Sequence, residues 1–366
     1  MERRDATLSA NQPGRLFLLL LVSVTLGPNL LALIKVSSAG TTQFVADRGL
    51  WVFQLLAAPH VMATLYLFFD RRDFAGVPRP AFTLLAIPIA LLIVNGIVLA
   101  FAPMPVVLVY VILTVAFTIW HFGRQNVGLV SFANRIAGRN KRNKFEQMTM
   151  NLGMLAGLLG AYDAFAPQAF MLNQATWQLD LSAIDPIFSR FKYVGGAIFA
   201  VLFPMTVSHI LVQWQRRDAL PLVLYGSSVF FFLPMYLSSD PLFAVGTWAF
   251  AHGAQYLVVL GFHAAGRAQA RSGIGVLMPV TLFVLPVVAG VLLWRFGDHL
   301  QIHGEEAEIK TAVAVLSGLT IVHYWVERYI WRFSIPARRT WMEKSFSFLH
   351  PAIRHDRAPA RRDAAT

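Results

Sequence analysis

Ten apolar runs, each about 20 residues long, occupy most of this 366-residue chain. A helix needs roughly 20 apolar residues to cross the hydrocarbon core of a bilayer, because it rises only about 1.5 Å per residue. The pattern predicts an all-α, polytopic bundle of about ten transmembrane helices. The expected spans are residues 16–34, 50–69, 81–102, 106–133, 147–165, 193–213, 219–238, 242–264, 275–296 and 308–332.

The basic residues give an independent test of this helix count. If ten helices cross the membrane and both termini are cytoplasmic, 24 of the 31 Lys and Arg residues lie inside, six lie outside, and only Arg124 lies within the buried part of a span. Cytoplasmic loops carry an excess of Lys and Arg, and one helix more or fewer would reverse every later loop. The asymmetry favours a multi-pass protein of a bacterial inner membrane with both termini in the cytoplasm.

Composition excludes several classes of function. The chain is 56% hydrophobic and 14% charged, with mean hydropathy +0.56 and no cysteine, which excludes a soluble domain, a disulfide scaffold and a thiolate metal site. The net charge of +12 is accounted for by topology signals, so nucleic acid is not an expected partner. We expect residues 1–336 to form a single transmembrane domain and residues 337–366 to form a basic, disordered cytoplasmic tail.

Histidines inside the spans are the first candidates for chemistry. His60, His121, His209, His252 and His323 each lie on a different span, and all five spans are even-numbered. Counted from the span ends at about 1.5 Å per residue, all except His209 fall in one band from mid-membrane to the inner leaflet. Polar side chains at this depth are costly unless they meet a partner. The band therefore predicts a shared site, with His209 nearer the cytoplasmic end.

Other polar residues follow these histidines at helical spacing. Neutral imidazole is the commonest transition-metal ligand, and a neighbouring polar group normally orients its second nitrogen. We therefore expect a metal held by His60, His121, His252 and His323. The accompanying residues are Arg124, Gln125, Gln255, Tyr256 and Glu327. Gln125, Gln255 and Glu327 would orient the ligands, and Arg124 would bind a polar substrate group or pair with Asp70 or Glu327.

Gly153, Gly157 and Gly160 give the fifth span a stripe of small residues. Such stripes let neighbouring helices approach closely in membranes. We expect this helix to be structural.

The histidine pattern, with Trp120-His-Phe-Gly123 as its most specific piece, resembles the bacterial and archaeal intramembrane β-carotene dioxygenases. The blocks His121-Phe-Gly-Arg-Gln125, His252-Gly-Ala-Gln-Tyr256 and His323-Tyr-Trp-Val-Glu327 are also similar to an uncharacterised bacterial membrane family at the edge of that group. The resemblance implies an all-helical membrane protein that holds one non-haem iron through histidines. It also implies oxygen-dependent cleavage of an apolar substrate, a carotenoid or another membrane lipid.

Three functions suit these residues. The first is a metal-dependent oxygenase, in which iron or another transition metal acts on a lipid. The second is a transporter or proton-coupled permease in which the histidines, Arg124 and Glu327 line a path. The third is a lipid-modifying transferase with one histidine as base. A helix-to-helix hydrogen bond is the structural alternative for each histidine, and the residues alone do not show that the histidines meet.

Overall fold

The computed structural model describes residues 12–37, 59–64, 77–137, 143–164, 185–215, 218–238, 241–269, 284–285, 287–292, 295, 306–331 and 335–349. Every regular element in these ranges is a helix. The elements are α2 (Gln12–Ser37), the π-helical η3 (Phe82–Ala86), α4 (Ile87–Phe101), α5 (Met104–Ile136), α6 (Lys144–Ala164), α7 (Asp185–Trp214), α8 (Ala219–Val229), α9 (Pro234–Leu237), α10 (Pro241–Gln269), α12 (Glu306–Ile330) and α13 (Pro336–Ser345).

The all-α prediction is confirmed over this part of the chain. Predicted spans 50–69 and 275–296 lie mostly outside the described residues. The other predicted spans coincide with helices, except that a turn interrupts span 219–238. Within the part of the chain that the structure describes, four segments are long and apolar enough to cross a membrane: Gln12–Ile34, Phe82–Phe101, Ser189–Trp214 and Phe243–Gly266. The total of ten helices and the cytoplasmic position of both termini stay predictions.

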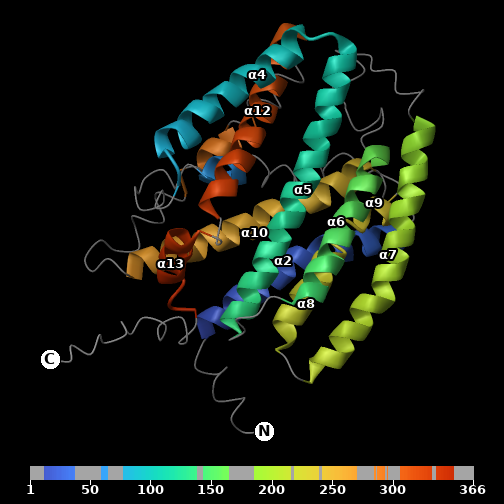
Figure 1. Ribbon diagram of the computed structural model, residues 1–366, viewed down its shortest axis with the longest axis vertical. Coiled ribbons are helices and arrows are strands. Elements are labelled where there is room, and N and C mark those ends of the chain that lie inside the picture. Colours follow the sequence, from blue (N-terminus) through green and yellow to red (C-terminus); the bar gives the residue numbers. More distant parts are fainter. Residues whose placement is uncertain are drawn as a thin grey trace, which may run out of the picture.

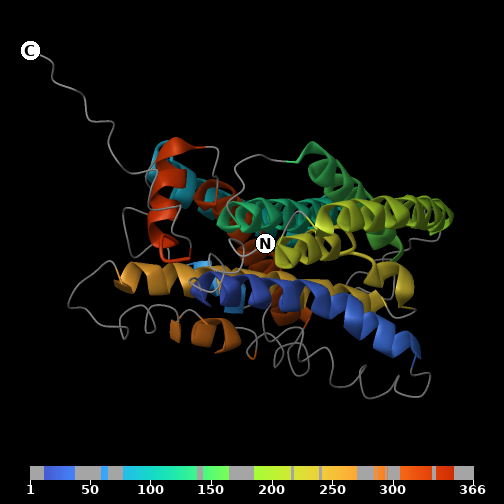
Figure 2. The same ribbon diagram turned by 90° about the horizontal axis from the view of Figure 1, so that it is seen from below.

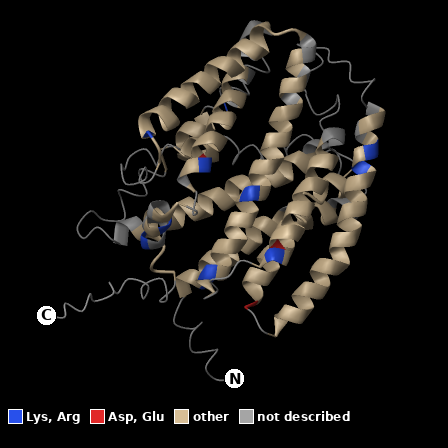
Figure 3. Cartoon of the chain, in the orientation of Figure 1, with Lys and Arg blue, Asp and Glu red and all other residues tan. Residues whose placement is uncertain are grey.

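Three neighbouring helices, α5, α6 and α7, lie side by side, and α2 and α10 run together behind them (Figures 1 and 2). Helix α12 packs along α4 (Figure 1). Charged residues are sparse along the described helices (Figure 3). Large apolar side chains on the outer faces are exposed, with Leu113 at 62% and Leu211 at 67%. An apolar exterior of this kind suits a hydrocarbon surrounding better than water.

The predicted span 219–238 is interrupted. Helix α8 ends at Val229, a turn covers residues 230–233, and the short α9 begins at Pro234. Proline lacks a backbone N–H and its ring clashes with the preceding helical turn, so one continuous helix is not favoured through this position.

Close packing of α6 against this interrupted span confirms the structural role expected for its glycines. A Cβ added at Gly153 would overlap the backbone oxygen of Val229, and one at Gly157 would overlap the ring of Phe232. The hydroxyl of Tyr236 donates a 2.6 Å hydrogen bond to the carbonyl of Ala156 in the same contact.

Helix α13 differs from the disordered tail expected after residue 336. It is followed by Phe346 and Leu349, which are both fully buried. The carbonyl of Ser345 lies so close to Gly266 of α10 that a Cβ there would overlap it. The apolar residues of this segment are buried against the bundle, and the basic charge of the segment alone does not predict this packing. Residues 350–366 lie outside the described residues.

Candidate metal centre

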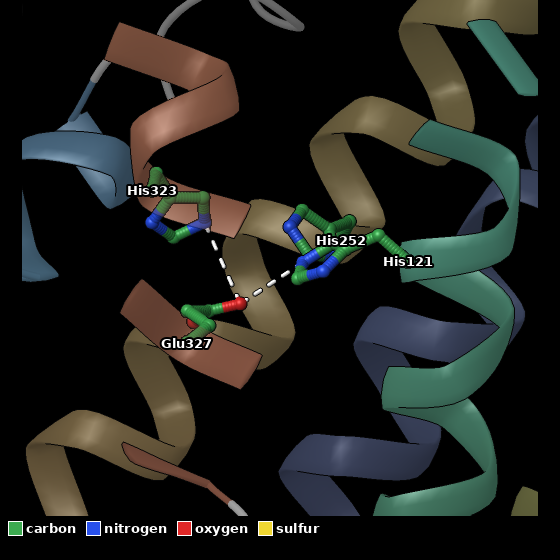
Figure 4. Close-up of side chains that lie close together, drawn as sticks. All are labelled: His121, His252, His323 and Glu327. Carbon is green, nitrogen blue, oxygen red and sulfur yellow. Dashed lines mark ion pairs between the residues drawn. The ribbon is translucent and has the colours of Figure 1, made fainter. Parts of the chain in front are cut away.

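Three helices bring four ligand-type side chains to one point inside the bundle. His121 lies on α5, His252 on α10, and His323 and Glu327 lie one turn apart on α12 (Figure 4). One ligand atom from each residue lies within 4.8 Å of all the others. All four residues are buried, the most exposed being His121 at 8%. Among the described residues, these four could hold a metal ion.

The carboxylate of Glu327 reaches toward two of the imidazoles. Its Oε2 lies 2.9 Å from Nε2 of His121 and 3.6 Å from Nε2 of His323, as the dashed lines in Figure 4 mark. Despite these distances, neither nitrogen has the geometry of a hydrogen bond to the carboxylate.

Several buried nitrogen and oxygen atoms of these four residues have no hydrogen-bond partner among the described residues. They are Nε2 of His121, both ring nitrogens of His252, Nε2 of His323 and Oε1 of Glu327. Leaving a buried donor or acceptor unsatisfied costs about 1–3 kcal/mol, and more for a charged group. One ligand atom from each of the four residues lies within 4.8 Å of the others, and a bound cation could use one lone pair from each.

Aromatic rings fix two of the imidazoles. Phe122 of α5 stacks on His252 of α10, with ring centroids 3.8 Å apart. Tyr324 of α12 stacks on His121 of α5 at 4.1 Å. In both cases the aromatic residue directly follows one candidate ligand in sequence and holds a ligand from another helix. Stacking of this kind restricts ring rotation and so keeps the nitrogens directed at the shared point.

The geometry changes the roles expected for two residues. Glu327, expected to orient a ligand, belongs to the four-residue group itself, because a spacing of four places it on the same face of α12 as His323. His60, expected as a ligand, lies beside the group, on the helical segment of residues 59–64. Its ring centroid is 4.8 Å from those of both His252 and His323.

Gln125 and Gln255 orient the site through the backbone. The Gln125 amide donates hydrogen bonds to Oε1 of Gln255 at 2.9 Å and to the carbonyl of His252 at 3.3 Å. The Gln255 amide donates to Oγ1 of Thr25 at 2.8 Å and to Oδ1 of Asn126 at 2.9 Å. This amide network joins α2, α5 and α10, and it contacts the main chain of His252 instead of an imidazole.

Arg124 does not face the site. Its side chain is exposed, and the described residues offer it no ion pair. The ion-pair contacts of Glu327 among those residues are with histidines. The expectation of a buried Arg124 is wrong. Arg124 is turned only about 60° around α5 from the buried His121, and this offset carries its side chain from the edge of the buried face to an exposed position among the described residues. Asp70, its other expected partner, lies outside the described residues.

His209 belongs to a separate polar cluster, as its expected depth indicated. Its Nε2 lies 3.1 Å from Oε1 of the buried Glu146. Asn134 and Asn143 donate further hydrogen bonds to the same carboxylate. This cluster joins the ends of α5, α6 and α7, and its polar atoms contact one another, as expected for a structural contact between helices.

One residue missed in the sequence is Thr64. Its Oγ1 lies 2.6 Å from Nδ1 of His323 and 3.0 Å from the hydroxyl of Tyr256. It follows His60 by four residues, so helical spacing places both on one face, and this spacing could have revealed it. Phe122 and Tyr324 had no comparable signal, since aromatic residues are common throughout the spans.

Comparison of the chain with protein-family models, with curated proteins and with solved structures gave no match. The chemistry of the site therefore follows from its own residues. Three imidazoles and one carboxylate are a ligand set for a divalent transition metal, and they leave coordination positions open on an ion that accepts five or six ligands.

Proposed function

We propose that this protein is a metal-dependent oxygenase of a bacterial inner membrane and that its metal is held by His121, His252, His323 and Glu327. The observation that carries the proposal is the convergence of four buried ligand atoms within 4.8 Å. Hydrogen bonds among the described residues do not account for this arrangement, because at least one nitrogen or oxygen of each of the four residues has no such partner there.

Charge supports the presence of a cation. Glu327 is 4% exposed, and its ion-pair contacts among the described residues are with histidines, which are cationic only when protonated. A carboxylate buried without a compensating charge is strongly unfavourable. A divalent ion between Glu327 and three neutral imidazoles would offset that cost and use every ligand atom at once.

Non-haem iron is the metal we infer. Imidazole suits iron, zinc, copper and nickel, and histidine–carboxylate sites with open positions are typical of iron enzymes that use oxygen. The resemblance to intramembrane β-carotene dioxygenases supports the same metal. When bound, iron would supply oxygen activation. The residues of this chain would hold it in a dry, apolar surrounding that includes the rings of Phe122 and Tyr324.

The substrate we propose is an apolar molecule dissolved in the membrane, a carotenoid or another lipid. The exposed surfaces of the helices are apolar, as at Leu113 of α5 and Leu211 of α7. The exposed position of Arg124 removes the reason to expect a polar substrate group bound by this residue at the centre.

Elemental analysis of the detergent-purified protein tests the site directly. We expect about one transition-metal ion per chain in the parent, and little in His121→Ala and Glu327→Gln, because each removes a ligand. Arg124→Ala and His209→Ala are matched controls, since both remove polar side chains of neighbouring helices outside the group. Full metal content in His121→Ala, or equal loss in both controls, would contradict the assignment.

A proton path through the membrane is a second candidate, favoured by the position of Glu327 between two imidazoles. Buried carboxylate and histidine chains are typical of proton relays. This function predicts that the parent binds no metal after reconstitution. It also predicts that proteoliposomes show a proton flux that Glu327→Gln abolishes. A lipid-modifying transferase with a histidine base would instead be active and indifferent to chelators.

A further inference from the structure

The two ring nitrogens of His323 have different surroundings. Its Nε2 belongs to the metal-ligand group and has no hydrogen-bond partner among the described residues, while its Nδ1 lies 2.6 Å from Oγ1 of Thr64. A neutral imidazole carries a proton on one nitrogen and a lone pair on the other. Only the form with the proton on Nδ1 leaves Nε2 able to bind a cation.

The hydroxyl oxygen of Thr64 can accept a hydrogen bond from the Nδ1–H of His323, because the oxygen has lone pairs available. The hydroxyl of Tyr256 lies 3.0 Å from the same oxygen, so the Thr64 hydroxyl has a second polar partner. All three side chains are nearly fully buried, with exposed fractions of 4% for Thr64, 3% for Tyr256 and 2% for His323. Water from the surroundings is therefore not positioned to replace a missing hydroxyl.

Helical spacing explains how this arrangement is built. Thr64 follows His60 by four residues, and Tyr256 follows His252 by four residues. Thr64 therefore shares a helix face with a histidine beside the metal-ligand group, and Tyr256 shares one with a member of that group. The contact among Thr64, Tyr256 and His323 consequently joins three parts of the chain: the segment of residues 59–64, α10 and α12.

We propose that Thr64, held by Tyr256, is a positioning residue that fixes His323 with its proton on Nδ1 and its Nε2 directed at the metal. This inference rests on the proposed metal site and adds an outer hydrogen-bonding group to it. Groups that bind the second nitrogen of a ligating histidine set its tautomer and ring orientation, and their loss typically lowers metal affinity 10- to 100-fold.

The test is a titration of the metal-free, full-length protein in detergent with Co²⁺, followed by its visible absorption. We expect Thr64→Val to raise the Kd for Co²⁺ by about 10- to 100-fold and to shift the absorption bands, because the His323 ring loses its anchor. Thr64→Ser retains the hydroxyl and should restore both the Kd and the spectrum. Tyr256→Phe should raise the Kd by less, since the Thr64 hydroxyl remains.

Thr149→Val is the matched control. Thr149 is fully buried and its hydroxyl lies 2.8 Å from that of Tyr225, a threonine–tyrosine pair on α6 and α8 that lies outside the metal-ligand group. Loss of this hydrogen bond should lower thermal stability without changing the Co²⁺ spectrum. A merely structural role for Thr64 predicts the same behaviour for Thr64→Val.

The outcomes separate the two proposals. If the parent binds Co²⁺ and His121→Ala does not, while Thr64→Val and Tyr256→Phe keep the parental Kd and spectrum, the metal site stands and the role of Thr64 is overturned. If the parent itself binds no Co²⁺, the metal site fails and the role of Thr64 fails with it. Should Thr64→Val not fold, Tyr256→Phe decides the result: a raised Kd for Co²⁺ supports the role of Thr64, and the parental Kd and spectrum overturn it.

Discussion

At the scale of single residues, Glu327 has opposite effects on the protein with and without a metal. Without a cation, its carboxylate is buried beside imidazoles that carry a positive charge only when they are protonated. With a cation, the same charge becomes a ligand and offsets part of the positive charge of the ion. The Glu327 carboxylate is therefore expected to destabilise the metal-free protein and to stabilise the metal-bound protein.

Glu327→Gln separates these effects. We expect the metal-free variant to unfold at or above the temperature of the metal-free parent, because a buried charge has been removed. Added metal should stabilise the parent by about 2.7 kcal/mol at 100 times its Kd, and should leave the variant unchanged. Thermal unfolding in detergent, with and without added Fe²⁺ under anaerobic conditions, measures both. Equal stabilisation of parent and variant would remove Glu327 from the ligand set.

The glycines of the helix contacts give a second prediction at this scale. An Ala at Gly153 would press its Cβ against the backbone oxygen of Val229, which cannot move as a flexible side chain can. Gly128→Ala is the control, because no atom lies within 4 Å of its added Cβ. We expect Gly153→Ala to lower the unfolding temperature. Gly128→Ala should stabilise the helix by roughly 0.5–1 kcal/mol. Destabilisation of similar size in both would contradict the packing described.

At the scale of elements, α12 matters most because it supplies two members of the metal-ligand group. Asn95 of α4 links α4 to α12. Its side-chain amide donates hydrogen bonds to the carbonyl of Ala314 at 2.5 Å and to Oγ of Ser317 at 3.1 Å. Tyr110 of α5 donates a 2.6 Å hydrogen bond to the same Asn95 side chain. One fully buried amide thus joins α4, α5 and α12, roughly two turns from His323.

Asn95→Ala should loosen α12 and weaken metal binding from a distance. Hydrogen bonds between transmembrane helices contribute about 1 kcal/mol each, and Tyr110 would also lose its acceptor. We expect lower thermal stability and a raised Kd for Co²⁺, measured in the same titration. Ser131→Ala is the control, since its hydroxyl bonds to the carbonyl of Val127 in its own helix. An unchanged Kd in Asn95→Ala would show that this polar contact does not hold the site together.

At the scale of the whole molecule, the direction in which the helices cross the membrane determines whether the metal-ligand group lies nearer the cytoplasmic or the outer side. Helix α5 carries His121 and runs between two loops that the basic residues assign to opposite sides. Ala102 precedes it in the loop expected outside, and Ala137 follows it in the loop expected in the cytoplasm. The chain has no cysteine, so an introduced thiol is the only one present.

Single-cysteine labelling tests this topology. In intact spheroplasts, a membrane-impermeant maleimide should label Ala102→Cys and should label Ala137→Cys only after lysis. Ala358→Cys should also need lysis, because both termini are expected to be cytoplasmic. Labelling of Ala102→Cys and Ala137→Cys from the same side would show that α5 does not cross the membrane. Labelling of Ala358→Cys before lysis would contradict an even number of spans with a cytoplasmic N-terminus.

Much of the architecture follows from local properties of the sequence, namely apolar runs, residue spacing and stripes of small residues. Long apolar runs predict helices, and the spans that fall within the described residues are helical. The short spacing between His323 and Glu327 places both on one face of α12. The glycine stripe of α6 likewise predicts a close helix contact, which the structure confirms at Gly153 and Gly157. Hydropathy and helical period suffice for these features because both are set within a few turns of one helix.

The composition of the candidate site was decided only by the tertiary structure. Periodicity does not specify which helices are neighbours or how far each is rotated about its axis. The sequence therefore identified His121, His252 and His323 as candidates. It did not show that Glu327 would join them, that His60 would lie beside the group, or that Arg124 would face outward. Thr64 and His323 are 259 residues apart in sequence, and only the packing of their helices brings a hydroxyl to an imidazole nitrogen.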